Sequence, residues 1–380
     1  MSGKIKYIKD IPDLEGKRVL LRASLNVPIK DGVLVDDFRI LRALETIEFL
    51  KEKGARTIII SHIGRDPKET LRSVYNHISK KIELDFVEEV IGDEVEKSVS
   101  KMKNGDVILL ENLRSNIGET TNDIQFTAKL ASNADLYIND AFAVAHRAHS
   151  SLVGIPRFLP SYAGLLFEYE YKNLSRAISP TQPALFILGG AKFSTKQPLV
   201  EKFVEIYDHV FIGGALVNDF YKARGWEVGR SKTSEFPVKL EHLLENPKIV
   251  LPIDVTVISL SGKSSNKKPN EVKPDEMIVD SGPETLKNLE TLIKKSSFVL
   301  WNGPLGDYKM GFRGSTERVA NIINDNNVPA VVGGGDTVAL IHAAGLVDSF
   351  VFSSTAGGAM LEFLLTGTLP AIEALQASTK

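Results

Sequence analysis

Short apolar runs alternate with segments of helical periodicity along the first half of the chain. We expect strands within the apolar runs at 18–28, 55–64, 106–114 and 134–142. We expect helices at 40–54, which closes on a glycine, at 126–134 and at 159–179, which ends before Pro180. Strands that alternate with helices are typical of a parallel sheet in an α/β domain.

The second half contains six apolar runs associated with glycine clusters. They lie at 183–192, 209–215, 249–257, 298–306, 330–337 and 350–358. In the third run, Asp254 stands where the other runs have glycine. Buried parallel strands read as continuous apolar runs, their ligands bind beyond the carboxyl ends, and glycine there lets the backbone approach a phosphate. The pattern predicts a second parallel sheet whose strand ends open onto a ligand.

The length of 380 residues exceeds what one hydrophobic core usually serves, which favours two domains. We expect a first domain at 1–160, a connecting helix at 161–178 and a second domain at 179–368, each built as a Rossmann-like parallel sheet flanked by helices. The hydrophilic segment 261–276 is rich in residues that break regular structure, and we expect it to be a surface loop.

Composition narrows the classes of protein that fit. The formal net charge of -2 argues against a partner that is nucleic acid or a membrane surface, since either would require a basic excess. The chain has no cysteine, so disulfides, thiol nucleophiles and thiolate metal sites are excluded. No apolar run reaches the roughly 18 residues of a membrane span, and the N-terminal residues carry charges throughout. We expect a cytoplasmic protein.

Arginine and glycine are divided between the two halves. Eleven of the fifteen arginines precede residue 179, and 19 of the 29 glycines follow it. Polar residues at or just after apolar runs of the first half are Arg22, Asn26, Arg39, His62, Arg65, Arg114, Arg147 and His149. Because parallel strands end at one edge of a sheet, these residues predict a convergent site for a small anion. For the two histidines, a structural hydrogen bond is the commoner role.

Three glycine loops of the second half carry candidate chemistry. In the loop 189–196, backbone N–H groups, a helix start and the lysines Lys192 and Lys196 suit a polyphosphate, although a tight turn with solvated lysines explains it equally well. In the loop 333–337, Asp336 suits Mg²⁺ beside phosphates or an N-cap of the following helix, and the two roles are compatible. The loop 302–306 is a third candidate, with an ordinary turn as the alternative.

Two common nucleotide-binding motifs are excluded. The only G-x-G, at 333–335, is followed by Val338 where a Rossmann fingerprint requires glycine. The tripeptide 262–264 matches the end of a P-loop, but Val257 occupies the required earlier glycine position.

Ten motifs that appear in order carry a resemblance to a known family. They are RASLNVP (22–28), DDFRI (36–40), SHIGR (61–65), ENLR (111–114), NDAFAVAHRAHSS (139–151), GGAKFSTK (189–196), DSGPET (280–285), WNGPLG (301–306), GGGDT (333–337) and STAGGA (354–359). Over nearly its whole length the chain resembles phosphoglycerate kinase.

The resemblance implies a monomeric, hinge-bending enzyme that transfers a phosphoryl group between 1,3-bisphosphoglycerate and MgADP, giving 3-phosphoglycerate and MgATP, with Mg²⁺ as cofactor. It implies catalytic roles for Arg39, Lys192 and Lys196, and a first domain that binds phosphoglycerate and also packs against the tail 369–380. The implied substrate-binding residues are Ser24, Asn26, Arg39, His62, Arg65, Arg114 and Arg147. The implied nucleotide-binding residues are Gly190, Ala191, Lys196, Gly214, Asn302, Pro304, Lys309, Gly334, Gly335, Asp336 and Thr337, with Asp336 on the metal.

The chain departs from the family pattern at two positions that touch the expected ligands. Ser24 stands where an Asp usually accepts from the glycerate hydroxyl, and Lys309 stands where a Glu usually holds the ribose. We expect weaker substrate binding from the first and altered nucleotide affinity or choice from the second. A degenerate relative that binds both ligands without catalysis is the main alternative, and an unrelated acid-sugar kinase would require all ten motifs to be coincidence.

Overall fold

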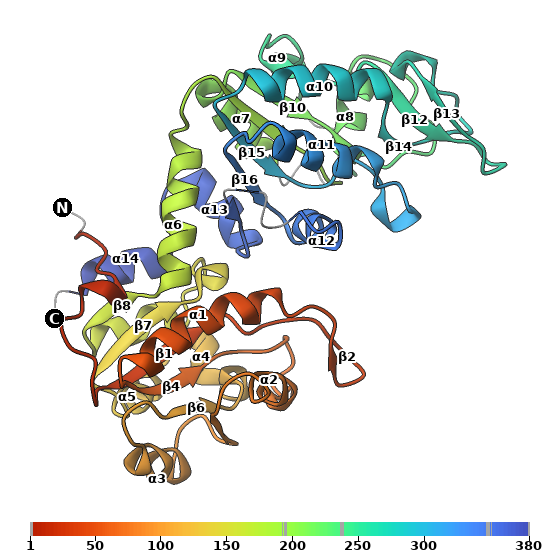
Figure 1. Ribbon diagram of the computed structural model, residues 1–380. Helices are drawn as coiled ribbons and strands as arrows, with labels where there is room; N and C mark the ends of the chain where they lie inside the picture. Colours follow the sequence, from red (N-terminus) through yellow and green to blue (C-terminus); the bar gives the residue numbers. More distant parts are fainter. Residues whose placement is uncertain are drawn as a thin grey trace. The chain divides into compact units, whose positions relative to one another are not determined.

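The computed structural model describes residues 3–191, 193, 196–235, 239–346, 350 and 352–378. The chain divides into two compact units, Met1–Lys172 with Thr368–Lys380, and Asn173–Gly367. Each unit is built on a six-stranded parallel sheet flanked by helices (Figure 1), so the expected fold class is confirmed.

The sheet of the first unit has the strand order β5-β6-β4-β1-β7-β8, and all its pairs are parallel. Its strands are β1 (Arg18–Ala23), β4 (Arg56–Ile60), β5 (Asp85–Val87), β6 (Val107–Leu110), β7 (Leu136–Asp140) and β8 (Ser161–Ala163). A short hairpin, β2 (Ile29–Lys30) and β3 (Val33–Leu34), follows β1. The continuous apolar runs of the sequence reflect burial on both faces of this sheet.

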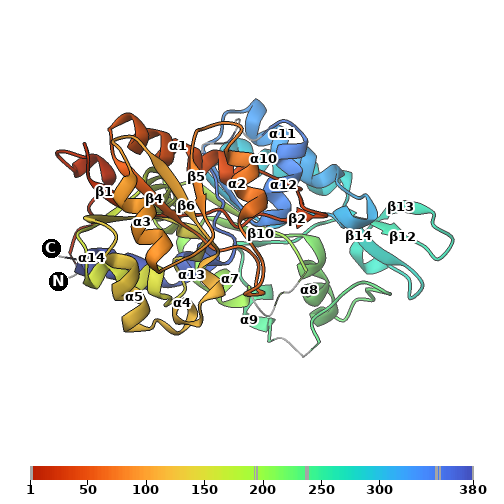
Figure 2. The ribbon, with the colours of Figure 1, turned by 90° about the horizontal axis from the view of Figure 1, so that it is seen from below.

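Helices cover both faces of the first sheet. Leu21 of β1 packs in one core with α1 (Phe38–Glu52) and α2 (Arg72–Ile78), while its neighbour Leu20 packs in a second core with α3 (Asp93–Lys101) and α5 (Ile124–Ala131). Figure 2 shows α3 lying across β4 and β6. The remaining helices of the unit are α4 (Ile117–Thr121), the start of α6 (Leu165–Ile178), and α14 (Pro370–Ala377). Successive side chains of β1 therefore serve opposite layers.

The second unit has the strand order β11-β10-β9-β15-β16-β17. Its main-sheet strands are β9 (Ala184–Leu188), β10 (His209–Ile212), β11 (Ile249–Val250), β15 (Phe298–Asn302), β16 (Ala330–Gly333) and β17 (Phe352–Ser353). Its helices are α7 (Gln197–Ile206), α8 (Val217–Ala223), α9 (Glu241–Leu244), α10 (Pro283–Lys295), α11 (Gly314–Asp325), α12 (Gly335–Ala343) and α13 (Gly358–Thr366). The strand order reverses between β9 and β15, and ligands of open α/β sheets bind beyond such a reversal.

The prediction for residues 249–257 was wrong in two respects. The run is divided into β11 and β12 (Val255–Ile258), and β12 belongs to a separate antiparallel sheet with β13 (Ser264–Lys267) and β14 (Met277–Ser281). Pro252 lies at the break and has no N–H for a ladder. Asp254 caps α10, because its carboxylate accepts the N–H groups of Glu284 at 3.0 Å and Thr285 at 2.7 Å. It therefore has a structural role rather than that of a strand-end glycine.

Two further expectations require correction. The segment 261–276 is not only a loop, since it contributes β13 and an ion pair of 2.7 Å between Lys267 and Glu276. The segment 159–179 is not helical from its start, because β8 precedes α6. The strand β13 consists of polar residues, of which Ser264, Ser265 and Asn266 are exposed and Lys267 is half-buried, so it lacks the apolar alternation that identifies strands in a sequence.

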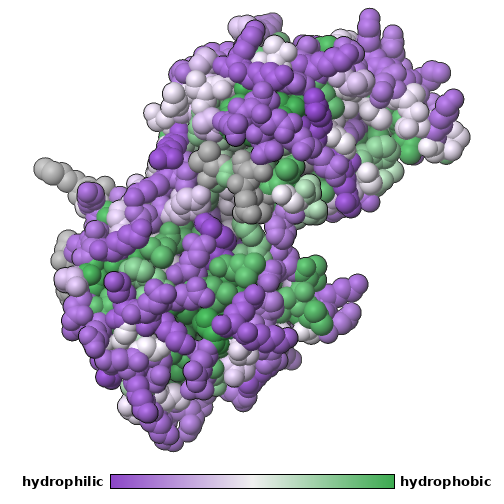
Figure 3. Space-filling model, in the orientation of Figure 1, coloured by the Kyte–Doolittle hydropathy of each residue, from purple (hydrophilic) through white to green (hydrophobic). Residues whose placement is uncertain are grey.

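The surface in Figure 3 is mostly hydrophilic, with smaller hydrophobic areas, one of them over the hairpin β2–β3. Val33 and Val35 are exposed there. Among the described residues, none of the helices taken singly is long and apolar enough to cross a membrane; only the bent pair α13 and α14 would be, on length and composition alone.

The start of α6 is held by a buried carboxylate from β7. Asp140 is fully buried, and its Oδ1 accepts the N–H of Phe167 at 3.0 Å. A Cβ on Gly164 would lie 2.3 Å from this oxygen, so glycine is needed for the approach. Burial raises the pKa of Asp140 to about 6, and hydrogen bonds from the first turn of α6 oppose the rise. The charged carboxylate therefore costs stability near neutral pH.

We predict that Asp140→Asn becomes more stable relative to wild type as the pH rises from about 4 to about 6, by an amount on the order of a few kcal/mol. The reason is that the folded protein holds the proton more tightly than the unfolded chain, so the contribution of Asp140 is lost as pH rises through its folded pKa. Asparagine keeps an acceptor for Phe167 and carries no charge.

The measurement is denaturant unfolding followed by far-ultraviolet circular dichroism across this pH range, since both tryptophans, Trp226 and Trp301, lie in the second unit. Asp135→Asn is the control of opposite sign. The hydrogen bond from Arg18 lowers the pKa of Asp135, so that variant should lose stability relative to wild type as pH rises. A pH-independent difference for Asp140→Asn would contradict the prediction.

Candidate functional site

Four adjacent strands of the first unit deliver the predicted anion-binding residues. Ser24 and Asn26 follow β1, His62 and Arg65 follow β4, Arg114 follows β6, and Arg147 follows β7. In the sheet these strands are neighbours in the order β6-β4-β1-β7. The carboxyl ends of parallel strands share an edge, and the structure thus brings these residues to one edge of the sheet.

Asn26 connects three of the segments at this edge. Its side-chain Oδ1 accepts the N–H of Gly64 at 2.9 Å, and its backbone carbonyl accepts from Arg39 Nη1, also at 2.9 Å. Arg39 lies at the start of α1 and is half-buried. Burial lowers the pKa of its guanidinium, and the charges of Glu170 and Asp36 partly oppose this. Arg39 is thus held in place by a partner that is itself a predicted ligand residue.

The arginines of this edge repel one another. Burial lowers the pKa of Arg114, and the charge of Arg147 lowers it further, while burial and then the charge of Arg65 lower the pKa of Arg147. Arg114 Nη1 donates to the carbonyl of Gly64, and its Nε is buried without a hydrogen-bond partner in the described part of the chain. An anion bound here would relieve the repulsion and accept a hydrogen bond from Nε of Arg114.

Arg22 does not belong among the ligand-facing residues, although the sequence places it at a strand end. Its side chain is only 1% exposed and is engaged in internal hydrogen bonds. Ser24 is also buried, at 5% exposed, next to the end of β1. An arginine at a strand end can support the site from inside or face a ligand, and burial decides between these roles. The position of a residue in the sequence does not show whether it is buried.

In the second unit, the loops after β9 and β15 clasp each other at the strand-order reversal. The N–H of Gly189 donates to the carbonyl of Asn302 at 2.8 Å, and that of Gly190 donates to the carbonyl of Pro304 at 2.9 Å. These N–H groups are therefore not free for a phosphate, contrary to the expectation for the loop 189–196. A Cβ on Gly303, whose φ is +97°, would lie 2.3 Å from the carbonyl oxygen of Gly189. Only glycine allows this approach.

Lys196 is the cation that this clasp holds. Its Nζ donates to the carbonyl of Gly189 at 2.6 Å and to Asn302 Oδ1 at 3.1 Å. Burial lowers the pKa of Lys196 to about 8, and the charge of Asp336 opposes the shift. The helix α7 begins only at Gln197, after this lysine. Lys192, the other predicted catalytic lysine, lies outside the described residues.

Asp336 and Thr337 lie in the first turn of α12. Gly334 occupies the N-cap with φ +97°, and no side chain caps the helix, so the N-cap role considered for Asp336 is wrong. Thr337 Oγ1 is buried without a hydrogen-bond partner among the described residues. Burial, and then a hydrogen bond with Asp336, raises the pKa of Tyr308 to about 12. The first N–H groups of a helix have no acceptor within it, which makes this end suited to phosphate.

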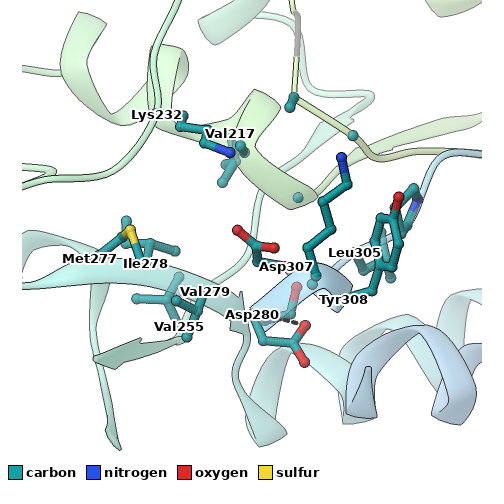
Figure 4. A pocket seen from close by; sticks show the side chains of 18 of the residues that line it. Val217, Lys232, Val255, Met277, Ile278, Val279, Asp280, Leu305, Asp307 and Tyr308 are labelled. Atoms are coloured by element: carbon teal, nitrogen blue, oxygen red, sulfur yellow. Dashed lines mark hydrogen bonds between the residues drawn. The ribbon is translucent and has the colours of Figure 1, made fainter. Parts of the chain in front are cut away.

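A pocket adjoins these groups in the second unit (Figure 4). Six of the predicted nucleotide-binding residues line it: Gly190, Ala191, Gly214, Pro304, Lys309 and Asp336. Lys196, Asn302, Gly334, Gly335 and Thr337 are not among its lining residues and lie instead in the clasp and at the start of α12. Some of the predicted nucleotide-binding residues thus line a pocket, and the others form an adjacent group, suited to phosphate, around Lys196 and the start of α12.

Sequence reasoning missed the apolar wall of this pocket. It consists of Val217, Val255, Met277, Ile278, Val279 and Leu305, with Lys232, Asp307 and Tyr308 as polar neighbours (Figure 4). Most of the wall comes from β12 and β14, in the antiparallel sheet that was not predicted. The DSGPET motif at 280–285 marks the end of β14 and was the available signal. An apolar wall beside groups suited to phosphate fits a nucleotide base.

Metal binding by protein side chains alone receives no support from the geometry. Within the described ranges, no three His, Asp or Glu side chains converge as a possible metal site. Asp336 offers a single carboxylate at the phosphate-type end of the pocket. Mg²⁺ commonly binds through one or two carboxylates together with substrate phosphates, and a metal that arrives with the nucleotide fits this arrangement.

The fold and the two sites are those expected of a two-domain α/β kinase, with cations at the strand ends of one unit and a glycine-lined pocket beside a helix start in the other. Comparison with known proteins specifies the family. Residues 8–367 match the family model described as phosphoglycerate kinase. The chain belongs to the phosphoglycerate kinase family, and the resemblance inferred from its ten motifs is confirmed.

Relatives and solved structures agree over the full length. The chain is 41% identical to the phosphoglycerate kinase of Dictyoglomus turgidum, covering 96% of each chain, and 42% identical to that of Trichodesmium erythraeum, again covering 96% of each. Its fold is similar to the phosphoglycerate kinase of Coxiella burnetii, with a TM-score of 0.88 and 34% identity over 99% of this chain and 100% of that one. The Pyrococcus horikoshii enzyme gives a TM-score of 0.88 and 31% identity over 98% and 99%.

The half-buried position of Lys196 leads to a prediction about stability. We expect Lys196→Met to be more stable relative to wild type at pH 7 than at pH 10. Below pH 8 the folded protein carries a charge that burial disfavours, whereas above pH 8 the folded lysine loses its proton before the unfolded lysine does, so wild type gains stability.

Denaturant unfolding followed by tryptophan fluorescence at pH 7 and pH 10 measures this difference. Lys222→Met, which removes an exposed lysine of α8, serves as the matched control. If the difference in free energy of unfolding between Lys196→Met and wild type is the same at pH 7 and pH 10, as in the control, burial does not disfavour the charge of Lys196.

Proposed function

We propose that the protein transfers a phosphoryl group reversibly between 1,3-bisphosphoglycerate and MgADP, giving 3-phosphoglycerate and MgATP. The observation that carries the proposal is the set of cations at the carboxyl ends of four adjacent strands, which suits a small ligand with both a phosphate and a carboxylate. The pocket of the second unit would take the nucleotide, with its base against the apolar wall.

In this proposal, Ser24, Asn26, His62, Arg65, Arg114 and Arg147 bind phosphoglycerate. Arg39 reaches the transferring phosphoryl group, and Lys192 and Lys196 stabilise its developing charge. Binding of the nucleotide phosphates would favour the charged form of Lys196, whose pKa burial lowers to about 8 in the free protein. Phosphoryl transfer depends on positioning and charge stabilisation rather than on covalent catalysis, and these residue types supply both.

Mg²⁺ would arrive with the nucleotide and contact Asp336, and Lys309 would contact the ribose. We also propose that the protein acts as a cytoplasmic monomer and that the units close about α6 during turnover. Closure is required chemically, because the two ligands bind different units while transfer needs their reacting atoms in contact in an environment that excludes water.

The test is consumption of ATP with 3-phosphoglycerate and Mg²⁺, coupled to glyceraldehyde-3-phosphate dehydrogenase and followed as loss of NADH. We expect turnover of roughly 1 to 1000 per second. Arg39→Ala should reduce turnover by roughly 100- to 1000-fold, since it removes charge stabilisation of the transition state. Arg42→Ala is the matched control one turn along α1, because Arg42 pairs with Glu45 and stacks on Tyr169. Near wild-type turnover of Arg39→Ala would remove the role given to Arg39.

A non-catalytic binding protein is the second candidate, favoured by Ser24 and Lys309, which replace the acids usual in the family. Absence of turnover in the coupled assay, with nucleotide binding intact by calorimetry, would support it. Measurable turnover would make both residues tolerated variations.

Ser24 provides a separate prediction on substrate affinity. A carboxylate accepts a hydroxyl hydrogen bond more strongly than a serine does, so Ser24→Asp should lower the KM for 3-phosphoglycerate by roughly 3- to 10-fold. Ser24→Ala should raise this KM, because it removes the acceptor. Steady-state kinetics of the three proteins give the order, and an unchanged KM in both variants would show that residue 24 does not contact the substrate.

A further inference from the structure

A buried arginine at the end of β1 is held by internal hydrogen bonds from each of its nitrogens. Arg22 Nε donates to Ser151 Oγ at 3.0 Å, Nη1 donates to the carbonyl of Ala23 at 2.6 Å, and Nη2 lies 2.9 Å from His62 Nδ1. The side chain is only 1% exposed. Since each of its three nitrogens is engaged and none reaches solvent, Arg22 has no direct access to a ligand.

The contact with His62 fixes the proton of the imidazole ring. A guanidinium has only donors and stays protonated in proteins, so Nδ1 of His62 must accept, and the ring proton must be on Nε2. The charged form of the ring, with a proton on both nitrogens, is disfavoured. Burial lowers the pKa of His62 far below its usual value, and the positive charges of Arg22, Arg114 and Arg147 lower it further.

The N–H at Nε2 has no hydrogen-bond acceptor among the described residues of the unit. His62 is 3% exposed, and Nε2 is buried without a hydrogen-bond partner in the described ranges. A buried donor left unpaired costs free energy, and native structures rarely contain one without a function. The Nε of Arg114, which follows the neighbouring strand β6, is unpaired in the same way. Two unused donors at one sheet edge mark where an anion is expected.

Glu119 supplies a counter-charge for Arg22, with Ser151 between them. Glu119 is 1% exposed and accepts from the N–H of Ser151 at 2.9 Å and from Ser151 Oγ at 2.7 Å. Burial raises the pKa of Glu119, but His149 at 3.7 Å, the charge of Arg22 and the two hydrogen bonds from Ser151 together outweigh this and lower it. Ser151 therefore bridges the two charges, and the Nη2 of Arg22 stays available for the imidazole.

We propose that Arg22 is a positioning residue, which locks His62 in its Nε2–H tautomer so that the ring donates a hydrogen bond to the bound anion. The identity of that anion as phosphoglycerate rests on the proposed function. The neutral imidazole of His62 adds a directional hydrogen bond beside Arg65, Arg114 and Arg147 without adding a further charge that would repel them. The opposite tautomer would present a lone pair to the anion and repel it.

The tautomer can be measured without ligand or activity. Long-range ¹H–¹⁵N correlation spectra of the full chain report which ring nitrogen carries the proton, and His62→Ala assigns the signals. We expect the Nε2–H form in wild type and a mixture of both forms in Arg22→Met. Arg114→Met is the control, because Arg114 adds charge near His62 but does not contact Nδ1. An Nδ1–H ring in wild type, or an unchanged ring in Arg22→Met, would overturn the proposal.

Loss of Arg22 leaves Glu119 buried without its counter-charge, which can unfold the protein. The double variant Arg22→Met, Glu119→Gln keeps the charges balanced and is tested in parallel. In the folded variants we expect the KM for 3-phosphoglycerate to rise roughly 10- to 100-fold, as for loss of a hydrogen bond to a charged group, with the KM for ATP unchanged. Equal rises in both KM values would indicate a general structural defect and refute the positioning role.

The outcome for this inference is separable from that for the proposed function. A wild-type protein without turnover would count against the function, while the spectra would still decide the tautomer. An active wild type with the Nε2–H ring and an unaffected Arg22→Met would leave the function in place and refute the role of Arg22.

Discussion

Parallel pairing of the strands is the constraint on which both sites depend. In the first unit, β1 pairs with β4 on one side and β7 on the other, and in the second unit, β9 pairs with β10 and β15. Because the strands run in one direction, residues that are far apart in the sequence reach the same edge. The cations of one unit and the glycine clasp of the other are two uses of this arrangement.

Burial then sets the state of the charged groups at these edges. It lowers the pKa of Lys196 and Arg39, it keeps His62 neutral, and it leaves donors unpaired that water would otherwise satisfy. Each of these costs stability in the free protein, and a bound anion would recover part of the cost. The sites are therefore organised before the ligand arrives, which is the usual requirement for electrostatic stabilisation of a transition state.

Much of this organisation could be read from the sequence because the core follows regular patterns. Continuous apolar runs identified the central strands β1, β4, β6, β7, β9, β10, β15 and β16, and the ordered motifs led to the family. The antiparallel sheet was missed because β13 consists of polar residues, and with it the apolar wall of the pocket. Sequence position also could not separate Arg22, which faces inward, from Arg114, which retains an unpaired donor.

The first unit is discontinuous in the chain, since residues from Thr368 onward return to it. Ala371 in α14 donates its N–H to the carbonyl of Ala145, and Ala371, Ile372 and Leu375 are buried. During synthesis from the N-terminus, the first unit cannot complete its core until the residues after Gly367 have left the ribosome, whereas the second unit is continuous and has left it before them. The unit that is translated first is therefore the last to have its whole chain available for folding.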